Sequence, residues 1–248
     1  MATAIAIQEV EKRFGDHTVL NRISLSVEEG EIVAIMGSSG GGKTTLLKCI
    51  SGLLTPEGGS IEVMGIDVKS RTEEARRKMG MVFQSAALFD FMSVRENILF
   101  GARRMHHLPL AEEAELVDRA LRQVGLEDAG ALMPSELSGG MRKRVGIARA
   151  LALKPEVMLY DEPTTGLDPI TAYTVDKLIV SVRQELGLTS LVVSHDVASV
   201  SRVADRIAFL DEGKLVFVGT VEEFGRDENS AIRELVVKSQ AKSFSESV

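Results

Sequence analysis

The sequence has a single cysteine, Cys49, and no tryptophan among its 248 residues. One cysteine cannot form an intrachain disulfide, which favours a reducing compartment. No apolar run approaches the ~18 residues that span a bilayer. The N-terminus lacks a basic segment ahead of an apolar core, so we expect no secretory signal. These absences predict a soluble, cytoplasmic protein, so that any role at a membrane needs another chain to span it.

Positive charge is also scarce. Lys and Arg number 29 against 36 Asp and Glu, which gives a net charge of −7. Electrostatic clamping of nucleic acid needs a dense basic face, so we expect no nucleic-acid partner. A hydrophobic share of 44% with 26% charged residues is ordinary for a globular domain that buries a substantial core.

Apolar periodicity predicts a mixture of strands and helices. Short alternating strands are expected within residues 4–35, and the nearly continuous apolar run at 31–36 indicates a strand buried on both faces. Further strands are expected at 157–160, 188–194 and 207–218, with helices at 44–53, 94–105, 110–124, 141–153 and from 229 to a frayed polar end. This order predicts an α/β core that carries an inserted helical arm at about 86–156.

A glycine-rich loop follows the buried strand at 31–36. Its sequence, Gly37-Ser38-Ser39-Gly40-Gly41-Gly42-Lys43-Thr44, fits G-x-x-x-x-G-K-[ST], and Thr45 continues into the predicted helix. Glycines let successive N–H groups point at phosphate oxygens, while Lys43 reaches the β- and γ-phosphates and the Thr44 hydroxyl ligates Mg²⁺. A glycine turn that contains Lys-Thr by chance is the alternative. The strand before the loop and the helix after it favour nucleotide binding.

Two acids end the predicted strand at 157–160. Asp161 in such a position holds the Mg²⁺ shell, and Glu162 can polarise the attacking water as a general base. A solvated junction between strand and loop is the alternative, and the phosphate loop makes it the weaker one.

A second candidate anion site precedes a basic helix. Ser138, Gly139, Gly140 and Met141 follow Leu137 at a predicted helix N-terminus, where a hydroxyl and N–H groups can meet a phosphate. Taken alone, the pattern is also typical of a serine N-cap. With the two preceding motifs it resembles the signature of ABC ATPases, normally Leu-Ser-Gly-Gly-Gln.

The resemblance to ABC ATPases covers about residues 4–225. It implies an α/β P-loop NTPase core of RecA-like type, with an N-terminal antiparallel β subdomain and the helical subdomain inserted at about 86–156. Residues 226–248 then form a C-terminal helical extension. The resemblance places Phe14 on the adenine, Gln84 beside Mg²⁺, Asp168 in the loop that crosses the dimer interface, and His195 on the γ-phosphate. No such role falls to His17, His106 or His107.

In this family, the signature of one subunit covers the ATP that its twin holds. The resemblance therefore implies a homodimer with two ATP molecules between the chains, each completing the other's site. We expect Lys43, Gln84, Glu162 and His195 to carry catalysis of ATP hydrolysis.

Met141 replaces the usual glutamine, and the segments after Gln84 and around Ser138 resemble the ATPase of MCE/Mla-type bacterial lipid transporters. That resemblance implies phospholipid transport across the envelope from the cytoplasmic face of the inner membrane. It also implies a homodimeric permease, an MCE-domain protein and often a STAS-domain subunit as partners. An apolar patch is expected to accept a permease helix, with core packing as its alternative; it comprises Leu88, Phe89, Phe91 and Met92.

Two other functions stay open. An ABC importer for amino acids or other small solutes shares every nucleotide motif. A non-transport ABC protein is the alternative of another class, but it would carry a long coiled-coil insert or tandem cassettes, and the sequence has neither.

Overall fold

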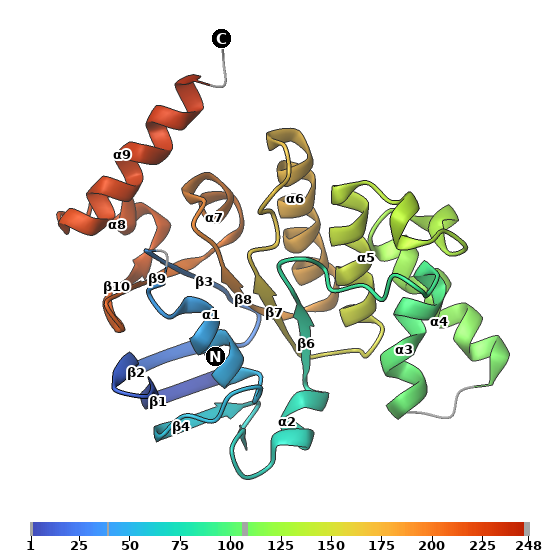
Figure 1. The fold of residues 1–248 in the computed structure, drawn as a ribbon, viewed down its shortest axis with the longest axis horizontal. Coiled ribbons are helices and arrows are strands. Elements are labelled where there is room, and N and C mark those ends of the chain that lie inside the picture. The colour runs from blue at the N-terminus through green and yellow to red at the C-terminus, as the bar shows by residue number, and fades with distance from the viewer. Residues whose placement is uncertain (1, 39, 106–108, 246–248) are drawn as a thin grey trace.

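The computed structural model describes residues 2–38, 40–105 and 109–245. Two sheets and a group of helices make up the molecule (Figure 1). Ser39, His106 and His107 lie outside the described residues, as do 246–248 of the expected C-terminal extension.

The central sheet has six strands in the order β10-β9-β3-β8-β7-β6. Its strands are β3 (Ile32–Gly37), β6 (Met79–Val82), β7 (Val157–Asp161), β8 (Thr189–Val193), β9 (Arg206–Asp211) and β10 (Lys214–Thr220). All neighbours pair in parallel except β9 and β10, which are joined by a turn at 212–213 within the segment expected to form a strand at 207–218. Strands β3, β7 and β8 are buried along their whole length, as expected for the middle of a sheet that is covered on both faces.

The second sheet is antiparallel, in the order β2-β1-β4-β5. It contains β1 (Thr3–Phe14), β2 (His17–Glu28), β4 (Gly58–Val63) and β5 (Ile66–Asp67). Strands β1 and β2 each have 12 residues, so the strands expected within 4–35 are longer than predicted. Helix α1 (Lys43–Ile50) packs between this sheet and one face of the central sheet, where the side chains of both sheets form a continuous apolar core.

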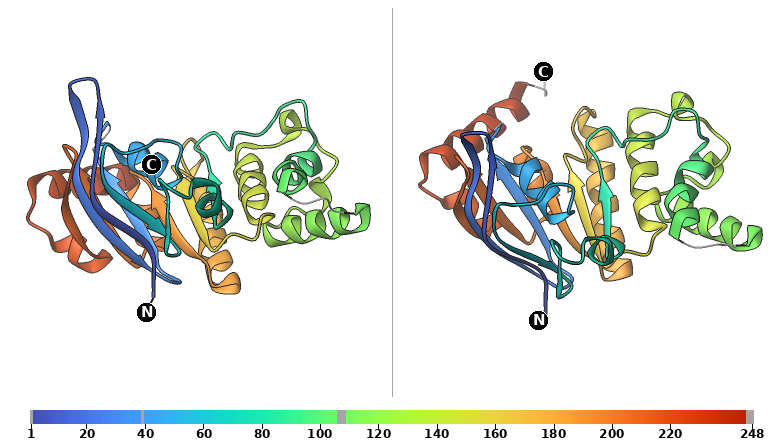
Figure 2. Two further views of the ribbon diagram at one scale, coloured as in Figure 1. Left: turned by 90° about the horizontal axis from the view of Figure 1, so that it is seen from below. Right: turned by 60° about the horizontal axis from the view of Figure 1, so that its bottom comes forward.

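Helices cover the other face of the central sheet. They are α5 (Gly139–Leu151), α6 (Pro169–Leu186) and α7 (Val197–Val203), followed by α8 (Val221–Arg226) and α9 (Ser230–Ser245). Together with α5, α3 (Val94–Met105) and α4 (Leu110–Gln123) form the helical arm, at the end of the molecule away from β1 and β2 (Figure 2). Within the described residues, no helix combines the length and apolar character that crossing a bilayer requires.

Two predicted helices end two or more residues earlier than expected. Helix α1 stops at Ile50 because Gly52 adopts a left-handed φ of 69°, and Arg76 on α2 (Thr72–Arg77) donates to the carbonyls of Ser51 and Gly52 at 3.3 and 2.9 Å. Helix α5 begins at Gly139, directly after Ser138, and ends at Leu151 rather than at residue 153. The signature glycines therefore lie within the first turn of a helix.

Candidate functional site

The carboxyl ends of β3, β7 and β8 form one edge of the central sheet. Ile35 on β3 and Asp161 on β7 are both in register with Val193 on β8. Chain segments that leave this edge carry the glycine-rich loop, the two acids and His195. Parallel strands place such segments together at the edge where α/β folds bind ligands.

The loop between β3 and α1 depends on glycine at both its ends. Gly37 has a φ of 149°, and a Cβ there would lie 1.9 Å from the main-chain oxygen of Leu210 on β9. Gly42 has a φ of 100°, and a Cβ there would lie 2.9 Å from the main-chain oxygen of Val19. No other residue type fits these two positions without displacing the backbone.

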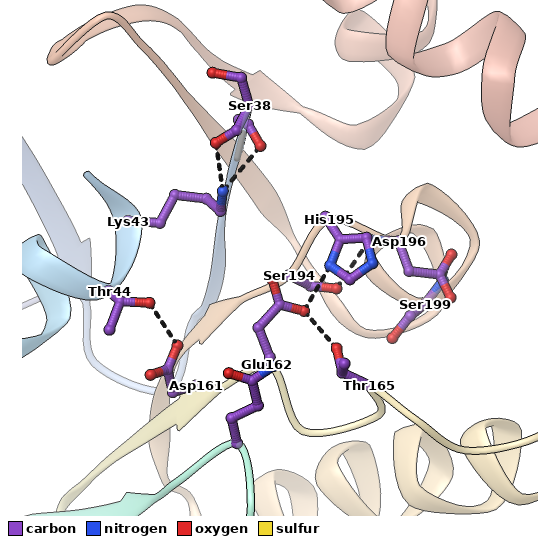
Figure 3. Close-up of polar contacts among 12 residues, drawn as sticks. Ser38, Lys43, Thr44, Asp161, Glu162, Thr165, Ser194, His195, Asp196 and Ser199 are labelled. Carbon is purple, nitrogen blue, oxygen red and sulfur yellow. Dashed lines mark hydrogen bonds and ion pairs between the residues drawn. The ribbon is translucent and has the colours of Figure 1, made fainter. Parts of the chain in front are cut away.

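Lys43 holds its ammonium at the centre of this loop. Its Nζ donates to the carbonyls of Gly37 and Ser38 at 2.9 and 2.8 Å (Figure 3). Burial lowers the pKa of Lys43, and the negative charges of Glu162 and Asp161 oppose that shift. The loop therefore combines a fixed positive charge with the N–H groups at the start of α1, which is the arrangement that binds a phosphate chain.

Thr44 and Asp161 meet across the gap between α1 and β7. The Thr44 hydroxyl donates to Oδ1 of Asp161 at 3.1 Å (Figure 3). Burial raises the pKa of Asp161, and the bond from Thr44 opposes this rise. A hydroxyl oxygen beside a carboxylate oxygen supplies the hard ligands that Mg²⁺ prefers, so these residues fit that ion.

Glu162 is held in place by both its backbone and its side chain. Its φ of 50° is left-handed, and its N–H donates to the carbonyl of Val193 at 2.9 Å. Its Oε2 accepts a 2.8 Å bond from the Thr165 hydroxyl and lies 2.8 Å from Nδ1 of His195 (Figure 3). The carboxylate is therefore oriented at the mouth of the loop.

The segment that carries His195 is fixed by the residues on either side of it. The buried Ser194 hydroxyl accepts a bond from the N–H of Asp196 at 3.1 Å. Asp196 in turn caps α7, accepting from the N–H groups of Ala198 and Ser199 at 2.8 and 3.3 Å. The His195 side chain is 56% exposed, so it can reach a ligand at the edge of the sheet.

Gln84 and Phe14 lie on two elements outside the edge formed by β3, β7 and β8. Gln84 is exposed just beyond β6, and its main-chain carbonyl accepts a bond from Nζ of Lys143. Phe14 ends β1 with 50% of its surface exposed, and Nζ of Lys12 lies 5.3 Å from its ring centre. No hydrogen bond of the described residues joins the Gln84 side chain to the acids.

The signature residues lie at the start of α5, in contact with the start of α6 in the same chain. Ser138 caps the helix, because its Oγ accepts from the N–H of Met141 at 3.2 Å. A Cβ on Gly140 would lie 2.3 Å from Cγ2 of Thr171 on α6. Asp168 caps α6 by accepting from the N–H groups of Ile170 and Thr171 at 3.1 and 3.0 Å, and its bonds with Thr171 lower its pKa. The two segments are thus packed as one unit.

The apolar patch after Gln84 is only partly accessible. Phe91 is 76% exposed, whereas Leu88, Phe89 and Met92 are half-buried. The ring centres of Phe89 and Phe100 lie 4.5 Å apart, and Leu88 packs against the core of the helical arm. Leu88 and Phe89 therefore pack inward, as core packing predicts, whereas Phe91 is exposed and its contact with a permease stays a prediction.

Sequence reasoning missed three residues that position the site. Thr165 orients Glu162, and the fully buried Asn97 fixes the patch by accepting from the Phe89 N–H at 2.8 Å and donating to the Met92 carbonyl at 3.0 Å. Lys143, which is 6% exposed, donates to the carbonyls of both Gln84 and Glu162. Burial lowers the pKa of Lys143. The sequence pattern at 141–153 predicts only a basic helix. It contains no feature that would tell a buried lysine from an exposed one.

Comparison with known families gives a match over much of the chain. The profile of the family described as ABC transporter matches residues 20–165. The intermembrane phospholipid transport system ATP-binding protein MlaF of Haemophilus influenzae is 44% identical over 223 residues, which is 88% of this chain and 84% of that protein. The chloroplastic protein TRIGALACTOSYLDIACYLGLYCEROL 3 of Arabidopsis thaliana is 40% identical, over 95% of this chain and 74% of that protein.

A methionine import ATP-binding protein, MetN of Brucella abortus, is also similar. It is 40% identical over 89% of this chain, but the match spans only 60% of the longer relative. Among solved structures, CbiO1 of Clostridium perfringens, part of an ABC transporter complex, is similar with a TM-score of 0.84 and 31% identity over the full length of both chains. A dimeric ATP-binding cassette bound to ADP and Pi gives a TM-score of 0.79 at 31% identity, covering 88% of this chain and 98% of that one.

Proposed function

Since the chain belongs to the ABC transporter family and is an ATPase of that family, we propose that its ATP hydrolysis drives phospholipid transport through a separate membrane permease. The observation that carries the proposal is the 44% identity to a phospholipid transport ATPase subunit over 84% of that protein's length. The chain supplies the edge of β3, β7 and β8 at which ATP would bind.

We assign the ATP-binding role to the loop and to the exposed ring that ends β1. The assigned residues are Phe14, Gly37, Ser38, Ser39, Gly40, Gly41, Gly42, Lys43, Thr44 and Thr45. The Lys43 ammonium and the N–H groups at the start of α1 hold the phosphates, and Phe14 stacks on the base. Thr44, Asp161 and Gln84 would hold Mg²⁺. When bound, this ion neutralises charge on the phosphate oxygens.

Glu162 is the proposed general base for the attacking water. Its carboxylate is aimed by Thr165 and His195 rather than left to rotate, and such orientation is what a base needs to accept a proton in the transition state. Lys43 and His195 stabilise the charge that develops on the γ-phosphate. Gln84 lies on the segment that leads from β6 to the apolar patch at residues 88–92.

A second copy of the chain would complete each site with Ser138, Gly139, Gly140 and Met141, and Asp168 would cross the interface. The domain that performs this work spans 4–225, with its helical subdomain at about 86–156 and the extension at 226–248. We place the pair at the cytoplasmic face of the inner membrane, with Leu88, Phe89, Phe91 and Met92 toward the permease. An MCE-domain protein and a STAS-domain subunit are the further proposed partners.

Replacing Glu162 tests the hydrolytic part of the proposal. The Glu162→Gln variant should bind ATP as the wild type does, while phosphate release falls about 10²–10⁴-fold, as expected when a general base is lost. Glu156→Gln is the matched control, because Glu156 is an exposed acid beside the other end of β7 that pairs with Lys78. Wild-type phosphate release by Glu162→Gln would refute the assignment of the base.

Purification of the membrane partner tests the transported molecule. The complex, reconstituted in vesicles, should move labelled phospholipid between membranes in an ATP-dependent manner. Methionine uptake instead of lipid movement would favour the second candidate, a small-solute importer, which the 40% identity to a methionine import subunit supports.

A further inference from the structure

Lys143 is buried on α5 although its side chain carries a charge. It is 6% exposed, and two main-chain carbonyls on different loops accept its N–H groups. One is the carbonyl of Gln84, and the other is that of Glu162, at 3.1 Å. A buried ammonium is unfavourable unless acceptors satisfy it, so these two bonds fix the Lys143 side chain and both loops together.

Two other residues on the same face of α5 as Lys143, Gly146 and Arg149, contact the segment after Gln84. Arg149 donates to the carbonyls of Ala87 and Ala86 at 2.6 and 2.8 Å. A Cβ on Gly146 would lie 3.3 Å from Cβ of Ala86. Residues 143, 146 and 149 follow one another at a spacing of three, which keeps them on one side of a helix. These contacts attach residues 86 and 87 to the helix.

This segment is not in a relaxed conformation. Ala86 and Ala87 have left-handed φ values of 61° and 46°, as does Glu162 with 50°. Residues other than glycine keep such angles only when surrounding contacts enforce them. Bonds from α5 meet the carbonyls of all three of these residues, so α5 supplies part of that enforcement.

We propose that Lys143 is a positioning residue that fixes the backbone of Gln84 and Glu162 to the helix that begins at the signature. The inference rests on the proposed function and refines it. In the proposed function, Ser138 at the start of α5 contacts the nucleotide bound by the partner copy. Glu162 acts as general base on the nucleotide bound by its own chain. Lys143 therefore links closure over one ATP to the alignment of the general base at the other.

A set of three variants tests this role in the full-length chain, each purified as the complex that the wild type forms. Lys143→Met keeps an unbranched apolar side chain, one atom shorter than that of Lys, but removes both bonds, so kcat should fall about 10- to 100-fold with KM changed less than about threefold. Lys143→Arg restores donors at the same place and should recover most of kcat.

Arg144→Met is the matched control. Arg144, the next residue on α5, also donates to two main-chain carbonyls, those of Val124 and Gly125 at 3.2 and 3.1 Å, but these lie in the helical arm. Its kcat should stay at the wild-type value. Should Lys143→Met prove too unstable for assay, Lys143→Gln also tests the role. Its neutral amide ends one atom short of Nζ and cannot reproduce both bonds, so kcat should again fall at constant KM.

Three results would overturn the role of Lys143: wild-type kcat in Lys143→Met, an equal loss in Arg144→Met, or no recovery in Lys143→Arg. Failure of the proposed function looks different. It would be seen as absent ATP turnover in the wild type, or as full turnover in Glu162→Gln, whatever residue 143 is.

Discussion

At the scale of single residues, the backbone of Gly37 decides how closely β3 and β9 approach at the mouth of the loop. A Cβ at this position would lie 1.9 Å from the Leu210 main-chain oxygen, and no side-chain rotation can relieve this contact because the backbone fixes the positions of both atoms. Any substitution must therefore push the two strands apart or shift the loop. The carbonyl of Gly37 is also one of the two that hold Lys43.

Replacement of Gly37 by alanine should therefore harm both stability and binding. We expect Gly37→Ala to lower the free energy of unfolding by about 1–3 kcal/mol, the range for an overpacked site, and to weaken ATP binding because Lys43 is displaced. Thermal unfolding and titration with a fluorescent ATP analogue measure the two effects. Gly225→Ala on α8 is the control, since its Cβ meets nothing within 4 Å. A wild-type melting temperature in Gly37→Ala would contradict this account.

Residues that act through short, contiguous motifs could be predicted from the sequence, and the structure brings several of them together. Lys43, Thr44, Asp161 and Glu162 follow directly from a strand, a glycine loop and a strand end. Lys143 could not be predicted in this way, because its environment comes from loops 59 and 19 residues away along the chain. Its neighbours Arg142 and Arg144 carry the same positive charge but are more exposed, so the sequence alone does not single out Lys143.

At the scale of elements, the sequence predicted most of the buried parallel strands and the helices of the arm. It predicted no ranges for β4, β5, β6, α2, α6, α7 and α8. Strand β4 begins with two glycines and has only two buried positions, Ile61 and Val63. Its stability comes from antiparallel pairing with β1, about 50 residues earlier in the chain, which no local pattern reveals. The apolar strands at 31–36 and 157–160 and the helices of the arm were predictable because burial determines their pattern.

The loop between β6 and α3 carries the proposed contact with the permease, which can be tested by mutation. Phe91 is the exposed member of the patch, and Asn97 holds the backbone around it. If Phe91 inserts into the permease, Phe91→Asp places a charge in an apolar contact and should weaken the complex by about 10-fold or more. ATP binding should stay unchanged. Pull-down of the permease and nucleotide titration measure the two properties.

Leu110→Asp is the control for the patch. Leu110, on α4 of the same helical arm, is 81% exposed, so the change removes an equally accessible apolar side chain away from the loop. Its complex should form as in the wild type. Unchanged assembly and transport in Phe91→Asp, or equal losses in both variants, would exclude the patch as the specific contact.

At the scale of the whole molecule, the two halves of the proposed ATP site lie in different parts of one chain. The phosphate loop lies between the two sheets, whereas Ser138 begins a helix of the arm (Figures 1 and 2). No hydrogen bond of the described residues joins Ser138 to the loop. A γ-phosphate held by one chain therefore has donors on only part of its surface, and a second copy in head-to-tail orientation would supply the rest.

Mixed complexes distinguish completion by the partner from completion within one chain. In a pair made of Lys43→Ala and Ser138→Ala protomers, both changes fall in the same shared site and the other site stays intact. Placing both changes in one protomer next to a wild-type partner damages both sites. We therefore expect ATP retained after rapid gel filtration, in a Glu162→Gln background, to be clearly higher for the separated changes. The reverse order would mean that each chain completes its own site and that the head-to-tail pair is wrong.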